Sequence, residues 1–366
     1  MKDTWTEGDY VDSNTPLPPR SGKRASSGGN QKQTYKTSKA VKPKKRVRWG
    51  RIIGMLVLAA VLLIGWFVVD LFFKADKAIG TISLPSENVV DVPAEESVKV
   101  KPTAVLLLGL DSREKLGTMN TDVIMIAALN PDTKKATVVT VPRDTRIEQS
   151  GYAHKANSYY SNFYHEALKT TKDKEQAKLQ ALDKMKTMFG RYFGIDIKYA
   201  SIINFKGFSD VIDALGGVEV DVDMDMRYVD SVDGTNINLK KGRQELTGSQ
   251  ALDFVRYRKS NDGKNMSSDF DRNRRQGEVL GEIVDRLKSL GGATKLGSVI
   301  EAVGGNMRTD IPESEIRQLM FTYFGLTRSD VEFKPLEGKW VSPYVHADEQ
   351  SLADTRQALR AQLSVQ

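Results

Sequence analysis

The strongest constraint on this chain is residues 52–69, a run of 18 residues without one charged side chain. A helix of about 20 apolar residues is long enough to span a bilayer. Trp49 and Trp66 lie near the two ends of the run, as aromatic residues do at membrane interfaces. The sequence therefore predicts a transmembrane helix over residues 49–73.

The charges beside this run predict its orientation. Residues 36–51 carry eight Lys and Arg and no acidic residue, whereas only Lys74 and Lys77 follow the run closely. Positive charge stays on the cytoplasmic side of membrane helices. We therefore expect a single-pass protein of the cell membrane, with a cytoplasmic N-terminus and extracytoplasmic residues 74–366. A cleaved signal peptide is the alternative, but a leader of about 50 residues is too long for one.

Residues 1–48 are rich in Lys, Ser, Gly, Gln and Pro and poor in aliphatic residues, which predicts a disordered basic tail. Residues 1–51 have a net charge of +9 and the whole chain has +7, so the remainder carries about −2. The basic excess belongs to the tail, where contact with anionic membrane lipids is expected. The rest of the chain gives no argument for nucleic-acid binding.

Beyond the membrane run, residues 74–101 mix Pro, Glu, Ser and Val and are expected to form a stalk. From residue 102 onward, β-rich runs alternate with amphipathic segments, which predicts a layered α/β/α domain with a mixed central sheet. Residues 102–290 are assigned to this domain, and residues 291–366 to a C-terminal part that completes it. The expected strands are 104–110, 122–129, 136–141, 199–203, 218–222 and 331–336, and the expected helices are 173–193, 208–215, 249–254, 272–290, 294–303, 313–324 and 352–363.

Two aspartates stand where predicted strands end and begin. Asp111 follows a buried strand, and Asp122 begins the next one. Carboxylates from adjacent strands can hold a hard cation such as Mg²⁺ through oxygen ligands. The alternative for each aspartate is an ordinary turn or cap residue.

Arginines gather in the same parts of the pattern. Pro142 ends a predicted strand, so Arg143 lies at the edge of the sheet where α/β folds bind ligands. Arg256 and Arg258 are two residues apart and share one face of an extended segment. On a helix, Arg272 would lie beside the residue four positions later, Gln276. Each arginine alone could be a solvated surface charge.

Together these residues favour phosphoryl transfer. Arginine binds phosphate oxygens bidentately, and a divalent cation with several arginines neutralises the charge that such a reaction develops. The chain has no cysteine, which excludes disulfides, thiol nucleophiles and thiolate metal sites. It also has no P-loop and no G-x-S-x-G motif, and its three histidines show no triad partners.

Several motifs occur in a distinctive order between Thr103 and Leu290: LLLGLDSR, NTDVIMIAALNPDTKKATVVTVPRDT, HKANSYY, LKKGRQELTGSQALDFVRYRKS and SDFDRNRRQGEVL. In these motifs the chain resembles the LytR-CpsA-Psr family of cell-wall proteins. The resemblance implies a membrane-anchored, extracytoplasmic phosphotransferase of Gram-positive-type bacteria. Such enzymes transfer an anionic glycopolymer, for example teichoic acid or capsule polysaccharide, from an undecaprenyl-pyrophosphate carrier to peptidoglycan. Release of lipid phosphate is a further expected activity.

The resemblance also implies roles for single residues. Asp111 and Asp122 would hold Mg²⁺, with Mn²⁺ as the alternative cation. Asp269 would help to deprotonate the acceptor hydroxyl, and Arg143 would act in catalysis as well as in binding. The residues implied to bind pyrophosphate are Arg113, Arg143, Lys155, Arg256, Arg258, Arg272 and Gln276. The family holds its polyprenyl chain in an apolar tunnel, for which residues 173–193 are a candidate wall; the alternative for these residues is a plain core helix.

At two positions the sequence departs from the family pattern. Asn120 stands where the family usually has Arg, and Asp271 stands where it usually has Gly. Asn lacks the charged bidentate grip of Arg, and Asp271 would repel an anionic substrate or add a metal ligand. These departures motivate the alternative of a non-catalytic binder of polyprenyl-pyrophosphate lipids that scaffolds wall assembly. Transcription regulation is disfavoured, because a domain outside the membrane cannot reach DNA.

Overall fold

A computed structural model of the chain describes residues 76–84, 92–113, 118–149, 151–231 and 234–364, with the backbone alone at 112–113, 118 and 290–296. The predicted basic tail and the transmembrane helix over 49–73 lie outside these residues. In the ranges just given, no helix combines the length and the hydropathy needed to cross a bilayer.

A six-stranded sheet forms the centre of the fold, in the order β11-β6-β1-β2-β3-β12. The pairs β1–β6 and β3–β12 are parallel and the other three pairs are antiparallel, so the sheet is mixed, as predicted. Both edge strands come from the C-terminal part of the chain. The strands are β1 (Thr103–Arg113), β2 (Thr118–Asn130), β3 (Lys135–Thr140), β6 (Tyr199–Asn204), β11 (Met307–Thr309) and β12 (Val331–Pro335).

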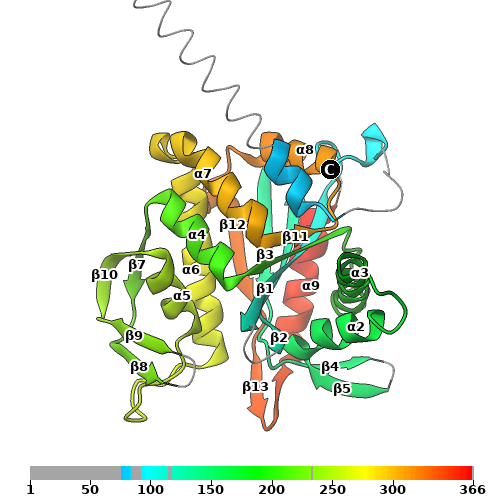
Figure 1. Ribbon diagram of the computed structural model, residues 1–366. Helices are drawn as coiled ribbons and strands as arrows, with labels where there is room; N and C mark the ends of the chain where they lie inside the picture. Colours follow the sequence, from blue (N-terminus) through cyan, green and yellow to red (C-terminus); the bar gives the residue numbers. More distant parts are fainter. Residues whose placement is uncertain (1–75, 85–91, 114–117, 150, 232–233, 365–366) are drawn as a thin grey trace, which may run out of the picture. The chain divides into compact units, whose positions relative to one another are not determined.

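Helices cover both faces of this sheet (Figure 1). One face carries α2 (Tyr159–Ala167), α3 (Lys174–Phe193) and α9 (Glu349–Leu363), and the other carries α4 (Phe205–Leu215), α5 (Gly248–Arg256), α6 (Asp269–Lys288) and α7 (Leu290–Asn306). Side chains alternate along each strand. Leu106 and Leu108 of β1 therefore pack against α3, whereas Leu107 faces the α4–α7 side. The predicted α/β/α layering is present.

Four strand pairs of the described chain lie outside the central sheet. The predicted strand 218–222 is β7. It pairs with β10 and packs against α6, and does not join the central sheet. Short strands like these depend on tertiary contacts and leave little periodicity in the sequence. The pairs are β4 (Arg146–Gln149) with β5 (Tyr152–Lys155), β7 (Val218–Val222) with β10 (Gly242–Leu246), β8 (Met226–Asp230) with β9 (Thr235–Leu239), and β13 (Gly338–Val341) with β14 (Tyr344–Ala347).

The structure corrects the expectation of a stalk over residues 74–101. Residues 76–82 are helical, and Ile79 and Ile82 are buried in a cluster with Val105 and Tyr199. Arg317 of α8 (Glu313–Tyr323) pairs with Asp76 at the start of this helix, with its Nη1 2.6 Å from a carboxylate oxygen. The described residues of this segment are therefore part of the packed domain. Short 3-10 helices are also present at Ala94–Glu96, Ala156–Ser158 and Arg328–Asp330.

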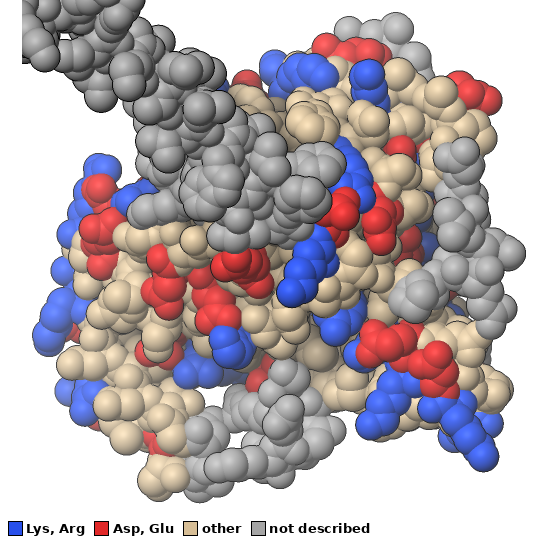
Figure 2. Space-filling view, turned by 45° about the horizontal axis from the view of Figure 1, so that its top comes forward, with Lys and Arg blue, Asp and Glu red and all other residues tan. Residues whose placement is uncertain are grey.

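The surface charge agrees with the near-neutral balance expected for this part of the chain. Figure 2 shows Lys and Arg interspersed with Asp and Glu across the face in view, with no broad area of one sign. Basic side chains commonly have an acidic neighbour, as in the pairs Lys184–Glu166 and Arg243–Glu219. This face offers no extended basic stripe of the kind that follows a nucleic-acid backbone.

Candidate functional site

A cavity of about 800 Å³ lies between the central sheet and helices α4 to α7. Its walls are largely apolar, because the sheet contributes the alternate side chains that do not enter the core beneath α3. Apolar or aromatic side chains that line it are Leu107, Val123, Met125, Ile203, Phe205, Phe208, Val211, Leu252, Val255, Leu280, Ile283, Leu287, Val299, Val303 and Met307. A long hydrocarbon chain is the kind of ligand that such walls suit.

Charged side chains also line this cavity. Seven residues with a predicted role in the site line the cavity: Asp111, Asp122, Arg143, Arg256, Arg258, Arg272 and Gln276. They come from strands β1 and β2, the end of β3, the end of α5 and the first turns of α6. Segments more than 150 residues apart in the sequence thus meet in one place. The side chain of Arg113 lies outside the described part of the chain.

A β-bulge explains how two aspartates of paired strands reach the same cavity. Gly109 of β1 pairs with Val123 of β2, and the next residue, Leu110, pairs with Thr121, so Asp122 is the extra residue. Bulges turn a side chain away from the regular alternation and are common beside functional sites. Gly109 is required here, because a Cβ on it would lie 2.8 Å from the Val123 Cβ.

Arg143 is held between two carboxylates. Its Nη1 lies 2.6 Å from Asp122 Oδ1, and its Nε lies 3.7 Å from Asp144 Oδ2. Asp144 is buried, and its other oxygen lies 2.9 Å from Lys155 Nζ. Lys155 is not among the residues that line the cavity; its ammonium group contacts Asp144, which in turn faces Arg143 of the lining.

The arginines around the cavity differ in burial: Arg272 is buried, Arg143 is partly buried and Arg258 is exposed. Burial lowers the pKa of Arg272 to about 9, with further lowering by Arg258 and Arg143. Partial desolvation, together with the charge of Arg143, also lowers the pKa of Arg258, although this residue is still exposed. The Nε atoms of Arg143 and Arg272 are buried and find no hydrogen-bond acceptor within the described ranges. Such a group of cations with unused donors is suited to binding an anion.

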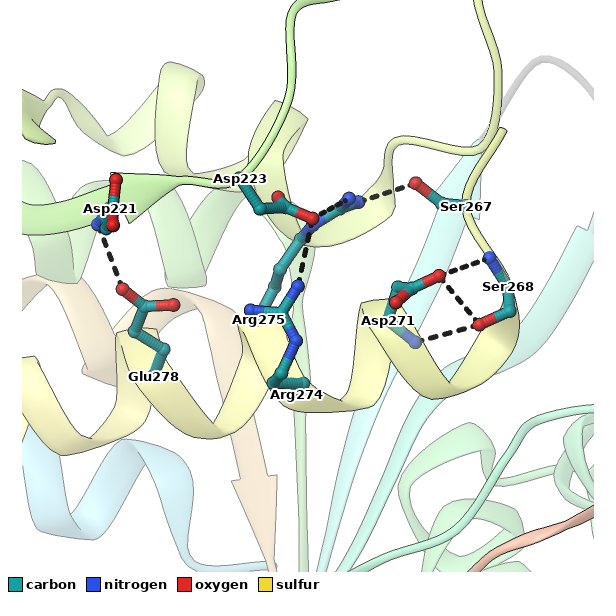
Figure 3. A network of polar contacts seen from close by, with 8 residues as sticks. All are labelled: Asp221, Asp223, Ser267, Ser268, Asp271, Arg274, Arg275 and Glu278. Atoms are coloured by element: carbon teal, nitrogen blue, oxygen red, sulfur yellow. Dashed lines mark hydrogen bonds and ion pairs between the residues drawn. The ribbon is translucent and has the colours of Figure 1, made fainter. Parts of the chain in front are cut away.

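The first turn of α6 holds two further residues of interest. Asp269 forms an ion pair with Arg272 and does not itself line the cavity. Asp271, expected to repel substrate or bind metal, instead closes a capping box: its carboxylate accepts hydrogen bonds from the Ser268 N–H and hydroxyl (Figure 3). The Ser268 hydroxyl in turn accepts from the Asp271 N–H. Asp271 therefore fixes where the helix begins, and the expectation of a substrate effect is not supported.

One important residue of this region was not predicted. Arg275 is fully buried, and its guanidinium makes two 2.9 Å contacts with the two carboxylate oxygens of Asp223 (Figure 3). It also donates to Ser267 and lies over the rings of Phe254 and Tyr257. Arg275 thereby ties α6 to α5 and to the segment after Arg258. Its place three residues after Arg272 was the available signal, but i,i+3 spacing does not distinguish a buried anchor from a ligand.

The structure also corrects the expectation that residues 173–193 form a wall of the apolar tunnel. Helix α3, over the predicted residues 173–193, lies on the opposite face of the sheet from the cavity. Leu182, Met185 and Phe189 are fully buried in the core there, so the plain core helix is the right interpretation. The lining residues that the sequence did not predict are mainly apolar side chains of α4 to α7 and of the sheet strands, together with Asn204, Tyr228, Asp230, Thr235 and Lys259.

The residues present fit a magnesium ion. Asp111 is buried and Asp122 is mostly buried, and both line the cavity beside the guanidinium groups. Among the described residues, no cluster of three or more Asp, Glu or His side chains could enclose a cation alone. Mg²⁺ typically takes one or two carboxylates and completes its octahedron with water and substrate phosphates. Two aspartates beside a phosphate-binding surface match that donor set.

Comparison with known proteins places the chain in a family. The model of the LytR_cpsA_psr family matches residues 74–361, more than three quarters of the chain. The chain belongs to the LytR-CpsA-Psr family. The match includes every residue described above as lining the cavity.

Relatives within the LytR-CpsA-Psr family have assigned activities. The chain is 25% identical over 327 residues to the polyisoprenyl-teichoic acid–peptidoglycan teichoic acid transferase TagU of Bacillus mycoides (strain KBAB4), covering 86% of this chain and 96% of the relative. It is 27% identical over 329 residues to the transferase of the same description, TagV, of Bacillus subtilis (strain 168), covering 85% of this chain and 77% of that one.

Solved structures of the LytR-CpsA-Psr family share the fold. The crystal structure of B. subtilis TagV matches with a TM-score of 0.56 and 27% identity, over 72% of this chain and 97% of that one. The structure of TagT bound to LI-WTA matches with a TM-score of 0.53 and 25% identity, over 74% of this chain and 98% of that one.

Proposed function

We propose that this LytR-CpsA-Psr protein is a Mg²⁺-dependent phosphotransferase that moves an anionic glycopolymer from an undecaprenyl-pyrophosphate carrier to peptidoglycan. One observation carries the proposal: Arg143 and Arg272, whose buried Nε atoms have no acceptor among the described residues, line a cavity whose other walls are largely apolar. That combination is complementary to a pyrophosphate attached to a hydrocarbon chain. The names of the relatives TagU and TagV make teichoic acid the first polymer to test.

The position of the cavity supports a membrane-bound donor. Val303 and Met307 line it, and between them Gly304 packs so closely on helix 76–82 that a Cβ there would lie 3.2 Å from Ala78 Cβ. Helix 76–82 follows the predicted transmembrane segment directly. We therefore propose that residues 74–366 lie outside the membrane, with the lipid chain of the donor among the apolar walls.

The arginines would bind and polarise the pyrophosphate. Arg143, Arg258 and Arg272 present N–H donors around the cavity. Arg272 is buried, so its interaction with phosphate oxygens would be stronger than in water. In the reaction, the acceptor hydroxyl oxygen forms a bond to the phosphorus that carries the polymer. The bridging P–O bond of the pyrophosphate breaks, and the lipid keeps the other phosphate. These guanidinium groups would stabilise the charge that develops on the leaving lipid phosphate.

Asp111 and Asp122 would hold Mg²⁺ against the pyrophosphate, and the bound cation would supply further neutralisation of phosphate charge. Asp269 is the carboxylate that we propose accepts the proton of the acceptor hydroxyl. Its ion pair is with Arg272, which lines the cavity, so Asp269 lies one side chain away from the bound phosphate. A carboxylate at the first position of a helix is also stabilised there by the helix dipole.

A transfer assay tests the proposal. The full chain in detergent micelles, with Mg²⁺, a short lipid-pyrophosphate saccharide and peptidoglycan oligomers, should form saccharide-linked peptidoglycan. Asp122→Ala and Arg143→Ala should each lose this activity by two or more orders of magnitude. Arg243→Ala is the matched control, because Arg243 is an exposed arginine of β10 paired only with Glu219 among the contacts described.

The second candidate, a non-catalytic lipid binder, is motivated by Asn120. This residue pairs directly with Asp111 across strands β1 and β2, where the family usually has an arginine. Tight lipid binding without any transfer would favour it, and Asn120→Arg would then be expected to restore transfer.

A further inference from the structure

A short hairpin beside the site presents an exposed tryptophan on a rigid base. Strands β13 and β14 leave Trp340 55% exposed and Val341 57% exposed. The base is fixed, because the Val345 N–H donates to the Asp144 carbonyl at 2.8 Å and the Tyr344 hydroxyl donates to the Ala153 carbonyl at 3.1 Å. The hairpin therefore presents Trp340 from a backbone that is fixed to the rest of the domain.

This indole is connected to the phosphate-binding residues. Lys155 Nζ lies 5.5 Å from the centre of the Trp340 ring and 2.9 Å from an oxygen of Asp144. The other oxygen of Asp144 faces Arg143, which lines the cavity. Lys155 was expected to bind pyrophosphate; instead it stands between that site and Trp340.

An exposed indole on a fixed hairpin, beside a lysine, has the features of a carbohydrate-binding surface. The C–H face of a sugar ring packs on the electron-rich face of an indole, and a lysine donates hydrogen bonds to sugar hydroxyls. We propose that Trp340 and Lys155, here called the indole platform, bind a sugar ring of the acceptor glycan next to the transferred phosphate. This inference rests on the proposed function and adds the acceptor side of the site to it.

A bilayer is the competing occupant, since Trp and Lys also lie at membrane interfaces. The fold argues against it. The hairpin projects from one end of the sheet, whereas helix 76–82 and α8 lie at the opposite end (Figure 1). Arg317 fixes α8 to Asp76, which follows the predicted transmembrane segment closely. The indole platform therefore faces away from the end at which the chain would leave the membrane.

The test is direct binding of peptidoglycan glycan oligosaccharides, measured by titration calorimetry on the full chain in detergent micelles. Trp340→Ala should raise the Kd for the oligosaccharide by about tenfold or more, as loss of a central aromatic contact does. Trp340→Phe should raise it less, because a ring remains. The matched control is Phe321→Ala, since Phe321 is an 82% exposed aromatic residue of α8. Binding of inorganic pyrophosphate should be unchanged in all three variants.

Equal oligosaccharide affinity in the unaltered chain and Trp340→Ala would overturn the inference. So would a loss of binding to phosphatidylglycerol vesicles in Trp340→Ala with oligosaccharide binding intact, which would identify a membrane contact. The proposed function fails separately. If the unaltered chain binds glycan through Trp340 and transfers nothing, the platform stands and the transferase does not. If Trp340→Ala transfers with an unchanged acceptor KM, the transferase stands and the platform does not.

Discussion

Arg143 Nη1 lies 2.6 Å from Asp122 Oδ1, so the carboxylate proposed to hold Mg²⁺ is already neutralised by the guanidinium proposed to bind pyrophosphate. Removing that guanidinium should therefore have opposite effects on the two ligands. Arg143→Ala should tighten Mn²⁺ binding about three- to tenfold, by loss of a nearby like charge, and weaken pyrophosphate binding. Electron paramagnetic resonance measures the first and calorimetry the second. Arg146→Ala, outside the cavity, should change neither, and a parallel loss of both affinities in Arg143→Ala would contradict this coupling.

Removal of the metal should stop the reaction. Chelation by EDTA should abolish transfer, and added Mg²⁺ should restore it, because two carboxylates beside a phosphate site need the cation to bind a polyanion. In Asp111→Asn the same addition should restore little activity. Transfer that continues unchanged in EDTA would show that the arginines alone suffice.

The lowered pKa of Arg272, about 9, predicts a pH dependence of ligand binding. Below pH 9 the guanidinium is charged and binds phosphate; above it the folded protein loses that charge. Affinity for inorganic pyrophosphate should therefore fall as the pH rises from 8 to 10, at most about tenfold per unit. Arg272→Ala should bind weakly throughout and lack this dependence. Identical pH profiles for the two proteins would exclude Arg272 as the titrating group.

Gly248 permits the close packing of α5 on α4. A Cβ at this position would lie 2.0 Å from the Ser209 carbonyl oxygen, which is backbone and cannot rotate away. Gly248→Ala should therefore lower the free energy of unfolding by about 3 kcal/mol or more, as overpacking against a fixed atom does. Thermal unfolding measures the change. Gly305→Ala is the control, because nothing lies within 4 Å of a Cβ there; equal effects of the two substitutions would contradict the prediction.

Asp223 compensates the buried charge of Arg275. Asp223→Asn would leave that guanidinium without its anion and should destabilise the fold by about 3–5 kcal/mol. Burial raises the pKa of Asp223, but the hydrogen bonds and charge of Arg275, a backbone hydrogen bond and the charge of Arg274 together lower it below its usual value. Acid should therefore weaken the same contact as the pH falls through that pKa. Asp225→Asn changes a nearby carboxylate in an exposed pair with Lys240 and should leave the free energy of unfolding almost unchanged.

Much of the fold could be predicted because its signals are local. The buried run that became β1 and the periodicity that became α3 depend on residues close in sequence. The spacing of Arg256 and Arg258 predicted that their side chains share one face. Both line the cavity, while Tyr257 between them is fully buried. These residues reached the site because an α/β sheet collects strand ends and loops at one edge.

The features that could not be predicted depend on contacts between residues that are far apart in the sequence. The bulge that turns Asp122 into the cavity arises from the pairing of β2 with Gly109 of β1. An amphipathic helix shows the same period whether it covers a core or a cavity, so α3 could be placed on neither face of the sheet. Asp271, in contrast, carries a local signal. Its spacing from Ser268 predicts a helix cap, whereas its departure from the family pattern suggested an effect on the substrate.

The most direct measurement follows the phosphate itself. A lipid-pyrophosphate saccharide is labelled with ³²P only on the phosphate attached to the sugar, and is incubated with the full chain, Mg²⁺ and peptidoglycan oligomers. The transferase account predicts label in the peptidoglycan product as a phosphodiester and unlabelled lipid monophosphate. Label that stays with the intact lipid, or leaves only as free saccharide phosphate, would contradict it.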